Sequence, residues 1–187
     1  MAMSLRLLRA AAETENLDDF HLSRLLLLLG AFQGRKKRHS VQGITKLAKL
    51  DFLLRYPNCL TRALQAIGKS DDLAQVGEVE ASSIEAKMIR FRYGPWDARY
   101  RRWIGLLSAK GLVNTYVEGN TVHVVITDKG KEVAGLFAEE DEFKLIAQRS
   151  LLIYKNFGDF SATKIKDFIY EVFPEIVTIK WGQEIQL

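Results

Sequence analysis

The chain has 187 residues, 48% of them hydrophobic and three of them proline, and it carries a formal net charge of +4. This composition is typical of a folded, helix-rich protein, and the mildly basic charge permits a nucleic-acid partner without requiring one. The single cysteine, Cys59, excludes a disulfide framework and a thiolate metal site, and the three histidines share no metal-ligand spacing. We therefore expect no metal, no cofactor and a location in the reducing cytoplasm.

The first sixteen residues are predicted to form a flexible N-terminal tail. They loosely resemble a signal peptide, but Arg6 and Arg9 interrupt the apolar core that such a peptide needs. Residues 1–16 are therefore set apart from the folded domain.

An apolar helix is predicted next, over about residues 17–33. Its run from Leu22 to Phe32 is shorter than the about 20 apolar residues of a membrane span, so we expect no membrane contact. Helices that are apolar all round are usually buried, either within their own chain or against a partner protein. Leu26 and Leu28 are the candidate partner contacts on this helix.

Two further helices follow a basic loop over residues 34–40. The first opens at Ser40 or Gly43, Pro57 stops it, and leucines spaced i, i+3 and i+7 form its apolar face. Its charged residues are predicted to lie outside: Lys46, Lys49, Asp51 and Arg55. The second covers about residues 60–67, and the polar stretch after it is predicted to be a linker.

The segment RFRYGPWDARYRRW, residues 90–103, contains five arginines and five aromatic residues. An extended piece over residues 88–93 is predicted to lead into a Gly-Pro turn, and Pro95 favours a helix that begins near Trp96. Apolar residues at i, i+3, i+4 and i+7 indicate one buried face, and Gly111 ends the helix.

Two strands joined at Glu118–Asn120 are predicted after this helix, and a helix over about residues 129–137 follows them. The order of helices, one extended piece and a hairpin is typical of a winged helix-turn-helix domain. The fold class is therefore predicted to be mainly α with a small β-hairpin (α+β), with a winged helix-turn-helix core over residues 17–137.

A helical C-terminal extension is predicted over residues 138–187. One helix follows four acidic residues, Ser161 caps the next, and both have stripes of aromatic and aliphatic side chains. Residues 131–187 contain seven basic and ten acidic side chains, which gives no electrostatic case for nucleic-acid binding. The candidate partner contacts in this part are Phe143, Ile146, Tyr154 and Phe168.

The arginine-rich helix allows three interpretations. Its arginines either form a solvated outer face whose stems cover the core, contact nucleic acid, or dock onto an acidic protein surface. Seven basic and two acidic residues lie between Glu85 and Lys110, a local excess of positive charge that agrees with a phosphate contact to double-stranded DNA. The candidate DNA-binding residues are Arg90, Arg92, Arg99, Arg101, Arg102 and Lys110.

No motif in the chain predicts catalysis. It contains no phosphate-binding G-x-x-x-x-G-K-[ST] loop, no H-E-x-x-H and no C-x-x-C, and Ser161 has no elbow motif around it. We therefore expect no catalytic residue and no enzymatic activity.

Three segments, GITKLAKLDFLLRYP, RFRYGPWDARYRRWIGLLSAKGLV and VHVVITDKGKEV, carry a resemblance to a known family. Together they resemble the small middle component of bacterial three-component ATPase systems, of which Lamassu-type antiphage defence complexes are an example. The resemblance spans about residues 17–180. It implies a non-catalytic, kleisin-like, winged-helix subunit that bridges an SMC-like ABC ATPase and works with an effector subunit.

Two functions therefore remain open. One is an accessory subunit that binds the ATPase, and the other is a free-standing winged-helix transcriptional regulator that binds DNA. A regulator should be a two-fold dimer with its basic helix toward the DNA groove. A scaffold subunit should expose an apolar patch of more than a few hundred Å².

Overall fold

The computed structural model describes residues 18–34, 40–74, 88–92 and 94–185. The expected tail over residues 1–16 lies outside them, as do most of the basic loop and much of the expected linker. The described part is mainly helical with a small antiparallel sheet, which confirms the predicted α+β class at that level.

The described residues form α-helices, β-strands and two short 3₁₀ turns. The α-helices are α2 (Asp18–Gly30), α3 (Ile44–Arg55), α4 (Pro57–Ala66), α6 (Tyr100–Ala109), α7 (Asp128–Glu139), α8 (Asp141–Phe157), α9 (Ala162–Val172) and α10 (Glu175–Thr178). The strands are β1 (Ser40–Gln42), β2 (Ile89–Phe91), β3 (Gly94–Trp96), β4 (Val113–Glu118) and β5 (Thr121–Ile126). Two short 3₁₀ turns cover Ala31–Gly34 and Asp72–Ala74.

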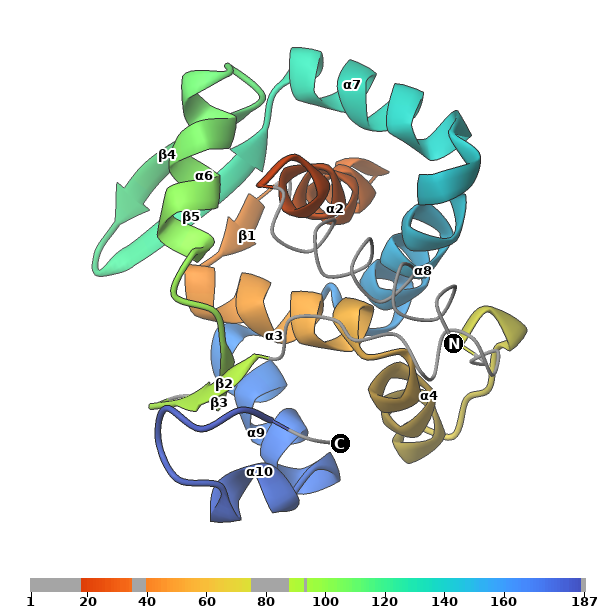
Figure 1. The fold of residues 1–187 in the computed structure, drawn as a ribbon, viewed down its shortest axis with the longest axis vertical. Helices are drawn as coiled ribbons and strands as arrows, with labels where there is room; N and C mark the ends of the chain where they lie inside the picture. The colour runs from red at the N-terminus through yellow and green to blue at the C-terminus, as the bar shows by residue number, and fades with distance from the viewer. Residues whose placement is uncertain (1–17, 35–39, 75–87, 93, 186–187) are drawn as a thin grey trace, which may run out of the picture.

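Helix α2 runs through the middle of the molecule and has almost no face toward solvent. Figure 1 shows it nearly end-on, with α6, α7 and α8 around it. Every residue from His21 to Leu29 is buried. Since each fully buried leucine contributes about 1.5–3 kcal/mol, this helix supplies a large part of the core. The leucine run is therefore buried within its own chain.

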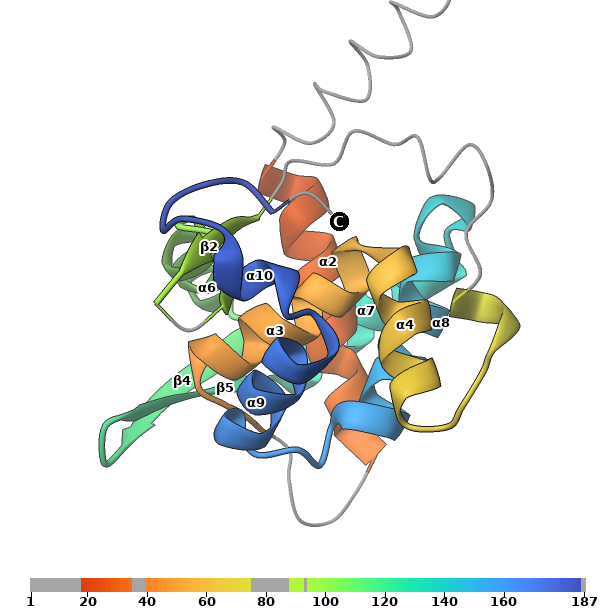
Figure 2. The ribbon, with the colours of Figure 1, turned by 90° about the horizontal axis from the view of Figure 1, so that it is seen from below.

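Helix α3 is buried along almost its whole length, including the face predicted to be polar. Lys46, Lys49, Asp51 and Arg55 are each at most 3% exposed, so the prediction that they lie outside is wrong. The reason is that β3 and α9, which come from distant parts of the sequence, pack on this helix together with α4 and α8. Figure 2 shows α9 lying beside α3.

The predicted hairpin is confirmed. Strands β4 and β5 pair from Val113↔Ile126 to Glu118↔Thr121, and Gly119 supplies the positive φ of 59° that the turn requires. Strand β1 lies where the next helix was expected to open, at Ser40 or Gly43; it pairs antiparallel with β5 and completes a sheet in the order β1-β5-β4, and the helix opens after Gly43.

The helix expected to begin near Trp96 begins four residues later. Residues Gly94–Trp96 form strand β3 instead, and this strand pairs antiparallel with β2 from Ile89↔Trp96 to Phe91↔Gly94. The Gly-Pro pair therefore begins a strand rather than a helix, and proline is tolerated there because β3 is an edge strand. Helix α6 follows at Tyr100.

The C-terminal segment shares one core with the rest of the chain. Leu25, Leu50, Ile153 and Ile169 belong to a single cluster of buried residues that extends across the expected domain boundary at residue 137. After α10 the chain returns to β2, where Ile185 N donates to the carbonyl of Met88. The division into residues 17–137 and 138–187 therefore does not separate two cores among the described residues.

Candidate partner-binding groove and arginine-rich segment

The arginine-rich segment folds around the carboxylate of Asp97. Arg99 donates to this carboxylate from its backbone N (3.0 Å), Nε (3.0 Å) and Nη2 (2.8 Å), and Arg55 donates from Nη1 (3.1 Å). Burial raises the pKa of Asp97, but the hydrogen bonds from Arg99 and the charges of both arginines outweigh it and hold the pKa well below its usual range. Asp97 therefore stays ionised and fixes the turn before α6.

A second carboxylate, Asp51, lies in the core with no exposed surface. Arg24 of α2 binds it in a bidentate manner, Nε to Oδ1 at 2.8 Å and Nη2 to Oδ2 at 3.0 Å, and the Tyr100 hydroxyl donates to Oδ2 at 2.6 Å. Burial raises the pKa of Asp51. The charge and the hydrogen bonds of Arg24 lower the pKa and, together with Arg55 and Tyr100, outweigh the effect of burial, so the pKa lies below its ordinary value. This ion pair ties α2, α3 and α6 together.

His21 lies between two of these arginines and is 2% exposed. Arg24 Nη1 is 2.8 Å from His21 Nδ1, and the imidazole ring packs on Trp103 with the ring centres 4.5 Å apart. A guanidinium group has donors and no acceptor, so Nδ1 accepts the bond from Arg24, while Arg99 Nη1 lies 3.4 Å from Nε2 on the other side of the ring. His21 therefore serves as a core acceptor.

The outer arginines of the segment have different surroundings. Arg102 Nη2 donates to Asp18 at 2.5 Å, and Arg90 donates to the backbone carbonyl of Ile179. Arg101 is exposed and makes no hydrogen bond or ion pair with the residues that the structure describes.

The six candidate DNA-binding residues do not form one uniform basic surface. Arg90, Arg99 and Arg102 bind oxygen atoms of this chain, and Arg92, Arg101, Arg102 and Lys110 are exposed. Arg99 binds the carboxylate of Asp97, two residues earlier, which is buried. DNA binding by the exposed residues stays a prediction.

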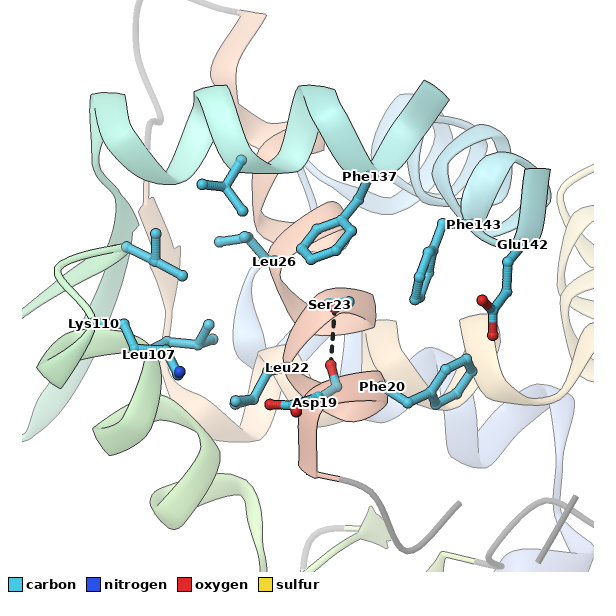
Figure 3. A pocket seen from close by; sticks show the side chains of 12 residues that line it. Asp19, Phe20, Leu22, Ser23, Leu26, Leu107, Lys110, Phe137, Glu142 and Phe143 are labelled. Carbon is cyan, nitrogen blue, oxygen red and sulfur yellow. Dashed lines mark hydrogen bonds between the residues drawn. The ribbon is translucent and has the colours of Figure 1, made fainter. Parts of the chain in front are cut away.

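A pocket of about 520 Å³ lies on the other side of α2, between α2, α6, α7 and α8 (Figure 3). We call it the α2–α7 groove, and it is lined by Asp19, Phe20, Leu22, Ser23, Leu26, Leu107, Lys110, Leu112, Val133, Phe137, Glu142 and Phe143. Phe143 stands at one end, with its ring 5.8 Å from that of Phe20 and 5.2 Å from that of Phe137. The lining is mainly aliphatic and aromatic.

The few polar groups of the groove lie mostly at its rim. Figure 3 shows Lys110 and Glu142 at opposite ends of the row of apolar side chains, with Asp19 between them. The hydroxyl of Ser23 donates to the backbone carbonyl of Asp19 at 2.8 Å. The interior of the groove therefore offers apolar contacts, and its charged side chains lie at the rim.

The candidate partner contacts on α2 need correction. Leu28 is completely buried, and Leu26 is 1% exposed and forms part of the groove floor. Neither side chain projects from the folded chain, because α6, α7 and α8 pack around α2.

The candidate partner contacts in the C-terminal part divide between the groove and the core. Phe143 lines the groove, whereas Ile146, Tyr154 and Phe168 are half-buried and pack against the core elsewhere. Tyr154 packs edge-on against Phe32 with the ring centres 4.8 Å apart. Phe143 is thus the predicted residue that combines partial exposure with a place in the groove.

The strand β4 carries exposed apolar side chains that the sequence analysis did not single out. Tyr116 is 46% exposed and Val117 is 68% exposed, and of the six residues in this strand Val113 is the buried one. The sequence does contain a sign of this exposure: Tyr116 and Val117 have the polar neighbours Asn114, Thr115 and Glu118, which indicate a strand with both faces in water.

Two further observations concern the residues that the structure describes. No group of three or more His, Cys, Asp or Glu side chains among them could hold a metal ion, and none of their helices combines the length and apolarity needed to cross a membrane. A comparison with protein families, curated proteins and solved structures finds no match to this chain.

Proposed function

We propose that this protein is a non-catalytic accessory subunit that binds an SMC-like ABC ATPase in a bacterial antiphage defence complex, together with an effector subunit. The resemblance of three sequence segments to the middle component of such systems suggests the partners. The α2–α7 groove is the observation that carries the proposal, because an apolar pocket with a charged rim suits the docking of another protein.

We further propose that residues of α2, β1, α3, α6, β4 and β5 form a winged helix. In this interpretation α6 takes the place of the recognition helix and the β4–β5 hairpin is the wing. The sheet order β1-β5-β4 and the position of α6 directly before the hairpin support it. The intervening helix α4 and the β2–β3 hairpin are then insertions into that core.

The composition of the hairpin favours the accessory subunit over a DNA-binding regulator. Residues 113–126 contain Glu118 and no lysine or arginine, so the hairpin offers no lysine or arginine side chain to a phosphate backbone. Its exposed Tyr116 and Val117 suit an apolar protein surface instead.

Co-expression with the products of the neighbouring genes, followed by pull-down of the full chain, tests the proposal. The wild-type chain should retain the ATPase subunit. Phe143→Ala should weaken binding at least tenfold, about 1.4 kcal/mol, since a half-buried aromatic side chain in a groove is a typical hot spot.

The matched control is Leu151→Ala on the same helix. Leu151 is 59% exposed and does not line the groove, so this variant should bind like the wild type. Thermal unfolding of both variants separates lost binding from lost folding. A wild-type chain that does not retain the ATPase overturns the proposal.

The regulator remains the second candidate, and the exposed Arg101 on α6 and Lys110 directly after it favour it. A regulator should form a two-fold dimer and bind a specific duplex without any partner protein. Size-exclusion chromatography with light scattering, and duplex binding by the isolated chain across a salt series, distinguish it from the accessory subunit.

A further inference from the structure

We infer that the α2–α7 groove binds one amphipathic helix of the ATPase partner, with an acidic side chain at the Lys110 end and a basic side chain at the Glu142 end. The inference rests on the proposed function and adds the form and the charge pattern of the occupant. It also assigns a direction along the groove to the occupant's charges.

The apolar lining sets the first requirement for the occupant. Leu22, Leu26 and Leu107 lie along the groove between its two charged ends, and Val133 also lines it. An amphipathic helix presents apolar side chains at i, i+3 or i+4, and i+7, a row that runs along such a groove. The occupant is therefore expected to insert about three apolar anchors.

The polar groups argue against a small molecule as the occupant. Small-molecule sites orient their ligand with a few precisely placed polar groups inside the pocket. Here the Ser23 hydroxyl is used by the carbonyl of Asp19, and the remaining polar side chains stand at the rim. Apolar contact along the whole groove and charge at its ends match an extended occupant better.

The end charges set the second requirement. The Lys110 ammonium and the Glu142 carboxylate are both exposed, and neither makes a hydrogen bond or ion pair with a described residue. The Lys129 ammonium bonds to the backbone carbonyl of Lys110 at 3.0 Å and adds a second positive charge at this end, whereas Asp19 adds a second negative charge to the rim. Complementary rim charges set the register of a partner and speed its association more than they add affinity.

Site-specific photo-crosslinking tests where the occupant lies. Phe143→p-benzoylphenylalanine keeps an aromatic group in the groove, and the full chain carrying it is co-expressed with the ATPase and effector subunits, irradiated and analysed by mass spectrometry. We expect a crosslink to an amphipathic helix of the ATPase. The same substitution at Leu151, outside the groove, is the control and should not crosslink to that helix.

A charge reversal then tests the direction. Lys110→Glu should weaken ATPase binding about tenfold at low salt, and replacing the acidic residue of the crosslinked helix with lysine should restore it. Glu142→Lys should respond in the same way to a basic-to-acidic change at the other end of that helix. Unchanged thermal unfolding confirms that the variants fold.

The outcomes separate this inference from the proposed function. If the wild-type chain retains the ATPase but the crosslink falls on a second copy, on residues 1–17 of this chain, or nowhere, the groove is not the docking site and the proposed function stands. If the crosslink forms but the charge reversals are not rescued, the inferred charge pattern is wrong. If the wild-type chain does not retain the ATPase, both proposals fail.

Discussion

The two ends of α6 lie in opposite chemical environments, although both pack against α2. Around Tyr100, at the N-terminal end, the buried charges are paired with one another: Arg24 with Asp51, and Arg55 with Asp97. Around Lys110, at the C-terminal end, the neighbours are apolar and leave a pocket of about 520 Å³. Charges that are buried must be paired within the chain, whereas an apolar groove with charges at its rim is suited to a partner.

Breaking the paired end should have the largest effect. Asp51→Ala leaves the Arg24 guanidinium buried without its bidentate partner, which should lower the free energy of unfolding by about 3–5 kcal/mol. Urea unfolding measures the change. Glu132→Ala on the exposed side of α7 is the control and should change stability by less than about 0.5 kcal/mol. A loss below about 1 kcal/mol for Asp51→Ala would show that the network contributes little.

Disturbing the groove wall should have the next largest effect. A Cβ at Gly130 would lie 2.0 Å from the backbone carbonyl oxygen of Leu112, so Gly130→Ala must displace α7 from the start of β4. The expected cost is at the upper end of the about 1–3 kcal/mol typical of overpacking. Gly135→Ala on the same helix meets nothing within 4 Å and should stabilise the protein by up to about 1 kcal/mol. Equal melting temperatures for the two variants would contradict this prediction.

Lys49 is an exception to the pairing of buried charges within the chain, because it is a buried basic residue without a matching acid. It is 1% exposed and makes no hydrogen bond or ion pair with a described residue. Burial, followed by the charge of Lys166, lowers the pKa of Lys49 from 10.5 to about 7.

The lowered pKa predicts a pH-dependent stability. Between about pH 7 and 10.5 the unfolded chain holds a proton on Lys49 that the folded chain has lost, so stability rises with pH in this window. Below pH 7 both states hold the proton and Lys49 adds no further dependence. The rise from pH 7 to 9 should be about 2 kcal/mol.

Unfolding at a series of pH values measures this rise. Lys49→Met should abolish it and be more stable than the wild type at pH 7, whereas Lys144→Met on the exposed side of α8 should keep it. A Lys49→Met variant with the wild-type pH profile would show that Lys49 does not titrate in this window.

The smallest expected effect concerns the exposed arginines. If the assembled complex holds duplex DNA, Arg101→Ala should flatten the slope of log affinity against log salt by about 0.9 and leave folding unchanged. Arg102→Ala removes an exposed ion pair with Asp18, so it should cost at most about 1 kcal/mol of stability. Salt titrations of both variants measure the slopes. Coincident curves for Arg101→Ala and the wild type would exclude a phosphate contact at this residue.

The candidate site was predictable only in part. Phe143 was singled out from an aromatic stripe, and the groove contains it. Asp51 could not be recognised as buried, because a carboxylate at a helix surface and one that faces a distant arginine have the same local sequence. Arg24 and Asp51 are 27 residues apart, so no periodic pattern relates them.

The sequence by itself determined the local elements. The leucine run, the stop at Gly111, the hairpin turn at Gly119 and the cap at Ser161 depend on near neighbours, and all of them appear where the pattern predicts.

Only the tertiary structure decided which faces are covered. Strand β3 and helix α9 bury the charged face of α3, and residues 88–96 form a hairpin that delays the start of α6. The α2–α7 groove exists because four helices from separate stretches of the chain leave a space between them. The physical reason is that hydrogen bonding and side-chain periodicity act over a few residues, whereas burial depends on everything that packs nearby.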